Sequence, residues 1–127
     1  MRITLQGRPI TKKNSQKIIV NRTTHRPMII QSDQYRQYEE ACMWILKGLV
    51  EKPLSGRFNL CCKYWMPDKR GEPDLIGLLQ ATADILEKAG IVENDRMFRM
   101  FDGSIVVGVD KQNPRVEICI SELQEGT

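Results

Sequence analysis

Residues 58–95 read FNLCCKYWMPDKRGEPDLIGLLQATADILEKAGIVEND. From Phe58 to Met66, apolar side chains alternate with Asn59, Cys61, Lys63 and Trp65, and this period of two predicts a long strand with one face on the core. A polar turn over residues 68–73 follows. Asp74 is then a favourable helix N-cap and Gly90 a favourable helix end, so a helix is expected between them. The apolar residues of its buried face are Leu75, Leu78, Leu79, Ile85 and Leu86.

A second helix is predicted before this stretch. Ser32 is a good N-cap, and apolar side chains recur at helical spacing from Tyr35 to Leu49, with Gly48 and Pro53 ending the pattern. The first thirty residues, in contrast, predict a strand around Ile3 and Leu5 followed by a basic hairpin.

The C-terminal part predicts β-structure. Two β segments lie between residues 98 and 109, and a final strand covers 115–120. The turn at residues 110–114 is expected to close the last hairpin. We therefore expect one α+β domain over residues 1–127, with a mixed or antiparallel sheet and two main helices.

Charge is unevenly distributed along the 127 residues. The net charge is +3, yet residues 1–31 carry seven Lys and Arg and no acid, which leaves −4 for the remainder. Such asymmetry points to a polyanionic partner, although a basic segment is often only a solvated edge. No apolar run approaches the roughly 18 residues of a membrane span, and the N-terminal segment does not resemble a signal peptide. A cytoplasmic protein without a membrane partner is expected.

Several kinds of site are disfavoured. The four cysteines show no C-x-x-C spacing, so reduced thiols in or near the core are expected rather than zinc ligands or disulfides. His25 is the only histidine, which leaves little basis for Ser/His/Asp or Cys/His catalysis. Neither of the common glycine-rich nucleotide-binding motifs occurs.

An acidic segment inside this basic protein remains to be explained. Carboxylates are the hard oxygen ligands that Mg²⁺ prefers, and a bound divalent metal offsets their repulsion of DNA phosphate while activating water. A metal-dependent nuclease would account for both the acidic segment and the basic N-terminal part of the chain. The acids concerned are Asp68, Glu72, Asp74, Asp84, Glu87, Glu93 and Asp95.

Residues 64–96 resemble the core of the RusA-type Holliday junction resolvases. The shared elements are Met66-Pro67-Asp68, then Pro73-Asp74-Leu75 at a helix start, then the run from Asp84 to Asp95. Residues 113–118 and 11–15 resemble the family more loosely. The resemblance implies a RusA-like fold and a homodimer that cuts four-way DNA junctions with Mg²⁺, for which Mn²⁺ substitutes. Many members are encoded by phages or prophages.

The family pattern is roughly P-D-x-D-N-L-x-K, followed by D-x-L and G-[IV]-x-x-D-D. Asp74 and Asp95 match metal-binding acids of this pattern, and the resemblance implies that both are catalytic. Other positions depart from it, which leaves the strength of the activity open. The second aspartate, the asparagine, the lysine and the first acid of the D-D pair fall on Ile76, Gly77, Gln80 and Asn94.

Helical geometry places the departures together. At about 100° per residue, Ile76, Gly77 and Gln80 fall on one stripe with Asp84 and Glu87, opposite the leucines, and we expect this stripe to face DNA. Neither an exposed isoleucine nor a helical glycine favours a solvated helix.

Replacement ligands and DNA contacts can also be proposed. Asp84 lies about 15 Å along the helix from Asp74, too far to share a metal, so a structural role is expected for it. Glu72 is the preferred additional metal ligand. The expected DNA-binding residues are Lys12, Lys13, Asn14, Lys17, Arg70 and Gln80.

Alternatives remain for both the residues and the function. Asp74 could be only a helix cap and Asp95 only a turn residue. Instead of a structure-selective endonuclease, the chain could be a RusA-like protein that grips branched DNA and cuts it weakly or not at all. A protein-interaction domain of a replication complex is a third, remote hypothesis.

Overall fold

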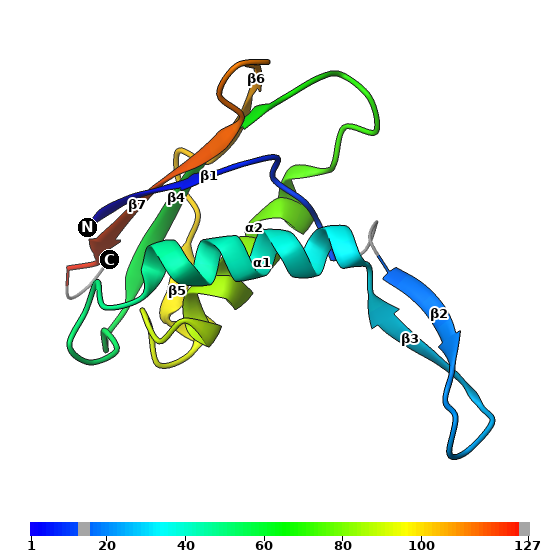
Figure 1. Cartoon of the computed structure of the whole chain (residues 1–127). Helices are drawn as coiled ribbons and strands as arrows, with labels where there is room; N and C mark the ends of the chain where they lie inside the picture. Colours follow the sequence, from blue (N-terminus) through cyan, green and yellow to red (C-terminus); the bar gives the residue numbers. More distant parts are fainter. Residues whose placement is uncertain (13–15, 125–127) are drawn as a thin grey trace.

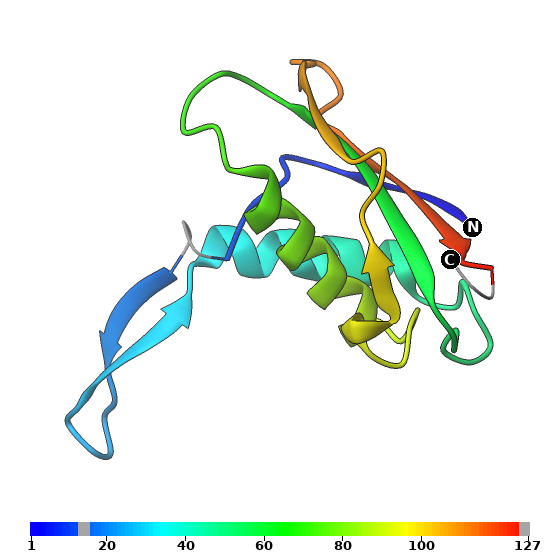
Figure 2. The same cartoon turned by 180° about the vertical axis from the view of Figure 1, so that it is seen from behind.

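The computed structural model describes residues 1–12 and 16–124. Its chain order is β1 (Arg2–Gln6), β2 (Gln16–Val20), β3 (Pro27–Gln31), α1 (Asp33–Leu46), β4 (Phe58–Met66), α2 (Leu75–Lys88), the short 3-10 helix η2 (Asp95–Met97), β5 (Phe98–Met100), β6 (Ile105–Val109) and β7 (Arg115–Glu122). Figures 1 and 2 show a compact body and a separate hairpin, made of β2 and β3, that projects from it. The expected α+β architecture with two main helices and a mixed sheet is confirmed.

The central sheet has five strands. Its order is β1-β7-β4-β5, and β6 also pairs with β4. β7 runs antiparallel to β1 and β4, whereas β5 and β6 run parallel to β4. The parallel pairing follows from α2, because the chain crosses back along this helix before it forms β5 and β6.

One face of the sheet forms the core. Along β4, alternate side chains from Phe58 to Met66 are buried, as the period of two predicts. Residues of β1 and β7 extend this buried face, and both helices cover it with side chains such as Tyr38 and Leu86. Cys61 and Cys62 point to opposite faces, and all four cysteines are free thiols, as expected. None of the described helices is long and apolar enough to cross a membrane.

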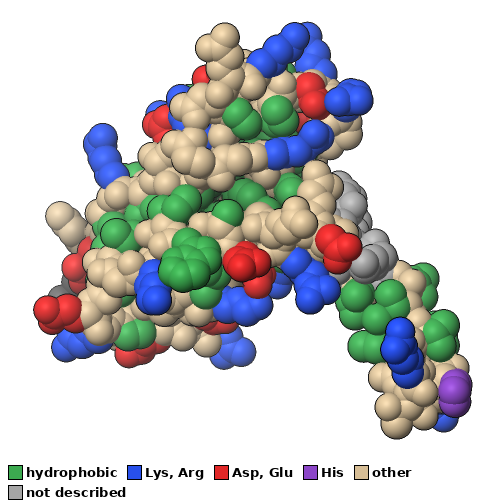
Figure 3. All heavy atoms as spheres, in the orientation of Figure 1, with side chains coloured by type: hydrophobic (Ala, Val, Ile, Leu, Met, Phe, Trp, Pro, Cys, Tyr) green, Lys and Arg blue, Asp and Glu red, His purple; other side chains and the backbone are tan. Residues whose placement is uncertain are grey.

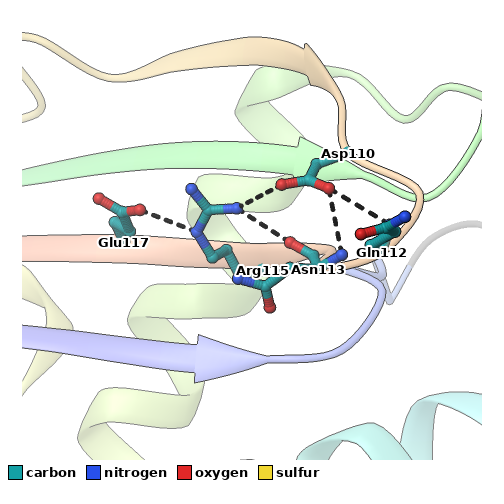
Figure 4. Close-up of polar contacts among 5 residues, drawn as sticks. All are labelled: Asp110, Gln112, Asn113, Arg115 and Glu117. Carbon is teal, nitrogen blue, oxygen red and sulfur yellow. Dashed lines mark hydrogen bonds and ion pairs between the residues drawn. The ribbon is translucent and has the colours of Figure 1, made fainter.

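The expected hairpin at residues 110–114 is wrong, because β6 and β7 do not pair. They lie on opposite sides of β4, and the turn carries the chain across the end of β4, where the Asp110 amide donates to the Met66 carbonyl at 2.8 Å. A local ion-pair network fixes this turn (Figure 4). The Arg115 guanidinium donates to Asp110 at 3.1 Å and to Glu117 at 2.8 Å, and it stacks over the Trp65 ring, 3.9 Å from the centroid.

The turn itself is closed by Asp110. Its Oδ1 accepts from the backbone amides of Gln112, at 3.3 Å, and Asn113, at 3.2 Å, as Figure 4 shows. Its Oδ2 accepts from Arg115, so the same carboxylate organises the loop and anchors the start of β7. The sequence signals for a turn were therefore correct, but they do not reveal which strands the turn connects in space.

Candidate active site

Asp74 lies at the N-terminus of α2, where it caps the helix. Its backbone is extended (φ −73°, ψ 147°) and its Oδ2 accepts a hydrogen bond from the Gly77 amide at 3.2 Å. The residue is exposed, and the buried Pro73 precedes it. Capping therefore holds the Asp74 carboxylate over the first turn of α2 while leaving it accessible to solvent.

The glycine at position 77 is explained by its neighbours. A Cβ there would lie 2.8 Å from Asp74 Oδ1 and 3.1 Å from Thr11 Cγ2. Thr11 is only 2% exposed, so it has little freedom to move away. Gly77 thus lets the loop before β2 approach the helix beside the Asp74 carboxylate.

Lys12, next in this loop, also contacts α2. Its Nζ lies 2.9 Å from Asp84 Oδ2, in an ion pair that joins the loop to the middle of the helix. This contact agrees with the structural role expected for Asp84. Lys12 is half-exposed, so its ammonium group still lies at the protein surface.

Asp95 is the first residue of η2, and a side chain near the C-terminal end of α2 fixes its position. Its backbone amide donates to Glu87 Oε1 at 2.9 Å. Asn94 caps η2, because its side-chain oxygen accepts from the Arg96 amide at 2.8 Å. Asn94, which departs from the acidic family pattern, therefore has a structural role in placing Asp95.

Asp95 lines an open cleft of about 330 Å³ between α2 and the loop after β5. Ile76 and Gln80 are exposed at this cleft, with Ile76 77% exposed, so the outward-facing part of the predicted stripe is confirmed. The cleft thus has two polar lining residues, Asp95 and Gln80, and its other lining residues are apolar. Its lining residues are Ile76, Leu79, Gln80, Ala83, Asp95 and Phe101.

Asp74 and Asp95 do not form a complete protein-only coordination shell for a divalent cation. Among residues 1–12 and 16–124, no three or more acidic, histidine or cysteine side chains gather as a metal-binding group. Glu72 is exposed in the turn before α2 and does not complete a trio with Asp74 and Asp95. Mg²⁺, however, is usually held by one or two carboxylates together with water and substrate phosphates. Asp74 and Asp95 each present an accessible carboxylate of the kind that such coordination uses, and of the two only Asp95 lines the cleft.

Basic groups lie next to the start of α2. The Arg70 side chain is 90% exposed, and its Nη2 lies 3.5 Å from Asp68 Oδ2. Arg8 donates to the Arg70 carbonyl at 3.0 Å. The pKa of Asp68 is lowered, first by the hydrogen bond from the Arg70 amide and then by the charges of Arg8 and Arg70. The turn before Asp74 is thus held in place by charged contacts, and the Arg70 guanidinium is largely exposed to solvent.

Not every expected DNA contact can be placed. Lys13 and Asn14 lie outside the described residues, and so does the side chain of Lys17. The sequence indicates no role for Thr11, which packs against Gly77, and it places Glu87 only on the outward stripe of the helix. In the structure, Glu87 accepts a hydrogen bond from the Asp95 backbone amide. For Glu87 a signal existed, because it faces outward eight residues before Asp95, but spacing alone does not reveal a bond to a backbone amide.

Comparison with known protein families agrees with these features. The family model for endodeoxyribonuclease RusA matches residues 6–121 of the 127-residue chain, and a search of curated proteins found no match. The matched region contains Asp74, Asp95 and the cleft that Asp95 lines together with Gln80 and Phe101. Because it extends over nearly the whole chain, this protein belongs to the endodeoxyribonuclease RusA family.

Proposed function

We propose that this protein is a Mg²⁺-dependent endonuclease that resolves four-way DNA junctions as a homodimer. Membership of the RusA family implies Holliday junction endodeoxyribonuclease activity. The finer proposal is supported by two accessible aspartates, one at the N-cap of α2 and one in η2. Asp74 is held by the first turn of the helix, and Asp95 is held by Glu87.

In this proposal, Asp74 and Asp95 would hold the cation, with water and substrate phosphates completing its coordination. A bound divalent cation supplies an activated water and stabilises the leaving oxygen of a phosphodiester. The exposed guanidinium of Arg70 and the ammonium of Lys12 bind flanking phosphates, and on the sequence alone Lys13, Asn14 and Lys17 are proposed for the same contact.

The cleft gives Gln80 a distinct role. Its exposed amide both donates and accepts hydrogen bonds, so it suits a phosphate oxygen or a base edge beside the cut strand. The apolar wall formed by Ile76 and Phe101 contacts sugar or base surfaces. Asp95 shares this cleft, which puts a candidate metal ligand beside the bound strand.

A second candidate is a protein that binds branched DNA but cuts it weakly or not at all. The exposure of Ile76 and Gln80 favours it, because these residues occupy the cleft at the positions where the family pattern has an acid and a lysine. The isoleucine side chain cannot ligate a cation, and a neutral amide does not supply the positive charge of a lysine.

Cleavage of a synthetic four-way junction in Mg²⁺ or Mn²⁺, with binding measured separately in Ca²⁺, distinguishes the two candidates. We expect Asp74→Asn to abolish cutting and retain binding. Asp33→Asn is the matched control, because Asp33 is also an exposed aspartate at a helix start, and this variant should cut normally. If the unaltered protein binds the junction but does not nick it in either metal, the endonuclease hypothesis is rejected.

The role of the departures can be tested in the same assay. Ile76→Asp combined with Gln80→Lys restores the acid and the lysine of the family pattern. If these positions limit turnover, the double variant cuts faster than the parent protein. An unchanged rate would mean that the site works with a different set of ligands. Sedimentation equilibrium of the free protein tests the homodimer directly.

A further inference from the structure

The hairpin formed by β2 and β3, residues 16–31, stands apart from the folded body. Both views of the chain show it projecting beyond the N-terminal end of α1 (Figures 1 and 2). No described side chain of this projecting hairpin belongs to the hydrophobic core. A two-stranded hairpin on its own is only marginally stable in water, so we expect a binding partner to stabilise this one.

Both faces of the projecting hairpin carry uncovered apolar side chains. Ile18 is 72% exposed and Val20 63% exposed, and they share one face because their positions differ by two. Ile19 and Met28 are directly opposite each other in the register and are partly exposed on the second face. A flat partner would cover only one of these faces.

The tip of the hairpin is ordered and cationic. Asn21 organises it: its side-chain oxygen accepts from the Thr23 and Thr24 backbone amides, and its backbone N–H donates to the Arg26 carbonyl at 2.8 Å. Arg22 and Arg26 are both exposed at this turn. On the face seen in Figure 3, the hairpin shows apolar and cationic side chains and the histidine, and no acidic one.

The cationic tip and the two apolar faces of the hairpin favour an anionic partner with a groove that the hairpin can enter. Residues 16–31 contain three Lys and Arg and no acid, which favours a polyanion. The major groove of DNA is about 12 Å wide and about 8.5 Å deep and admits a two-stranded β-ribbon. Such a groove contacts a ribbon on more than one side, as the two apolar faces require.

We propose that the projecting hairpin lies in the major groove of a duplex arm of the bound DNA, next to the branch that the cleft engages. This inference rests on the proposed function and gives the DNA partner a second contact. Arg22 and Arg26 neutralise phosphates at the groove edge, while Ile18 and Val20 contact apolar groups within it. A strand of five residues spans about 17 Å, which corresponds to about five base pairs at about 3.4 Å each.

The test compares two hairpin variants with a matched control in Ca²⁺, where binding is measured without cutting. Arg22→Gln/Arg26→Gln should reduce the slope of log affinity against log salt by about 1.8, since each phosphate contact contributes about 0.9. Ile18→Ser/Val20→Ser should weaken binding about tenfold. The control Lys52→Gln/Lys111→Gln removes two exposed lysines outside the hairpin and should leave the slope unchanged.

Footprinting supplies a second readout. With both hairpin variants, hydroxyl-radical protection should shorten by about five base pairs on a duplex arm, while protection at the branch persists. Thermal unfolding should be unchanged, because the altered side chains lie outside the core.

Two results would overturn the inference. One is an unchanged salt slope and footprint in both hairpin variants. The other is dissociation of a dimer into monomers with DNA contacts intact, which would make the hairpin a clasp for a second copy of the chain. Normal junction cutting alongside either result would leave the proposed function standing, whereas absence of binding to any branched DNA would reject both.

Discussion

Replacing Gly77 by alanine tests whether the start of α2 is built around the Asp74 carboxylate. On helix propensity alone, alanine in place of glycine stabilises a helix interior by about 1 kcal/mol. The structure predicts that this gain does not appear. The added Cβ would lie 2.8 Å from Asp74 Oδ1 and 3.1 Å from Thr11 Cγ2, so at least one of them must move.

The expected magnitude follows from what moves. Thr11 is buried, so the Asp74 carboxylate is the group that rotates, and its bond from the Gly77 amide is lost. Losing an N-cap costs about 1 kcal/mol, and shifting Thr11 by a few tenths of an ångström adds to that. Gly77→Ala should therefore be neutral or destabilising by up to about 1 kcal/mol, instead of stabilising by the same amount.

A double-mutant cycle measured by urea unfolding isolates this effect. In an Asp74→Ala background the obstructing carboxylate is absent, so Gly77→Ala should recover most of the propensity gain. The coupling between the two substitutions should be about 1 kcal/mol or more. Stabilisation of the unaltered protein by about 1 kcal/mol on Gly77→Ala would refute the idea that Asp74 and Thr11 require a glycine.

Three further substitutions probe the support of the site and the core. Glu87→Ala should cost about 1 kcal/mol and slow cutting, because it leaves the Asp95 amide without its acceptor, whereas Glu87→Gln should preserve both. Tyr64→Phe should cost about 1 kcal/mol in urea unfolding, since the buried hydroxyl bonds to Thr82 at 2.7 Å. Burial raises the pKa of the Cys42 thiol from its ordinary 9.0 to about 11. The unfolded thiol therefore ionises first, and stability should fall as the pH rises from 9 to 11, with a flatter profile in Cys42→Ala.

The periodic parts of the fold could be read from the sequence. β4 begins and ends where the alternation does, and α2 begins after its predicted cap. The error at residues 110–114 has a physical cause: a turn signal reports local backbone geometry, whereas strand order depends on packing between distant segments. β6 pairs in parallel with β4, on the side of β4 opposite β7, so the two strands that the turn joins are not neighbours in the sheet.

The outward face of α2 could be predicted from the sequence, but the contacts that support Asp74 and Asp95 could not. Helical spacing correctly placed Ile76 and Gln80 on an outward stripe, because that inference needs only the period of a helix. The sequence leaves Gly77 unexplained, whereas the structure gives two reasons for it: Asp74, three positions before it, and Thr11, sixty-six positions away in the chain. The contact with Thr11 is a tertiary property and leaves no local pattern to detect.

Asp74 serves as a helix cap, and a cap-preserving series separates that role from chemistry. Asparagine and serine cap helices about as well as aspartate, so Asp74→Asn and Asp74→Ser should unfold within about 0.5 kcal/mol of the parent, whereas Asp74→Ala should lose about 1 kcal/mol. If the carboxylate is a metal ligand, all three variants lose junction cutting, whatever their stability. If Asp74 only caps α2, cutting follows stability, and the asparagine and serine variants remain active. Measuring unfolding and cleavage on the same preparations therefore assigns the carboxylate to one role or to both.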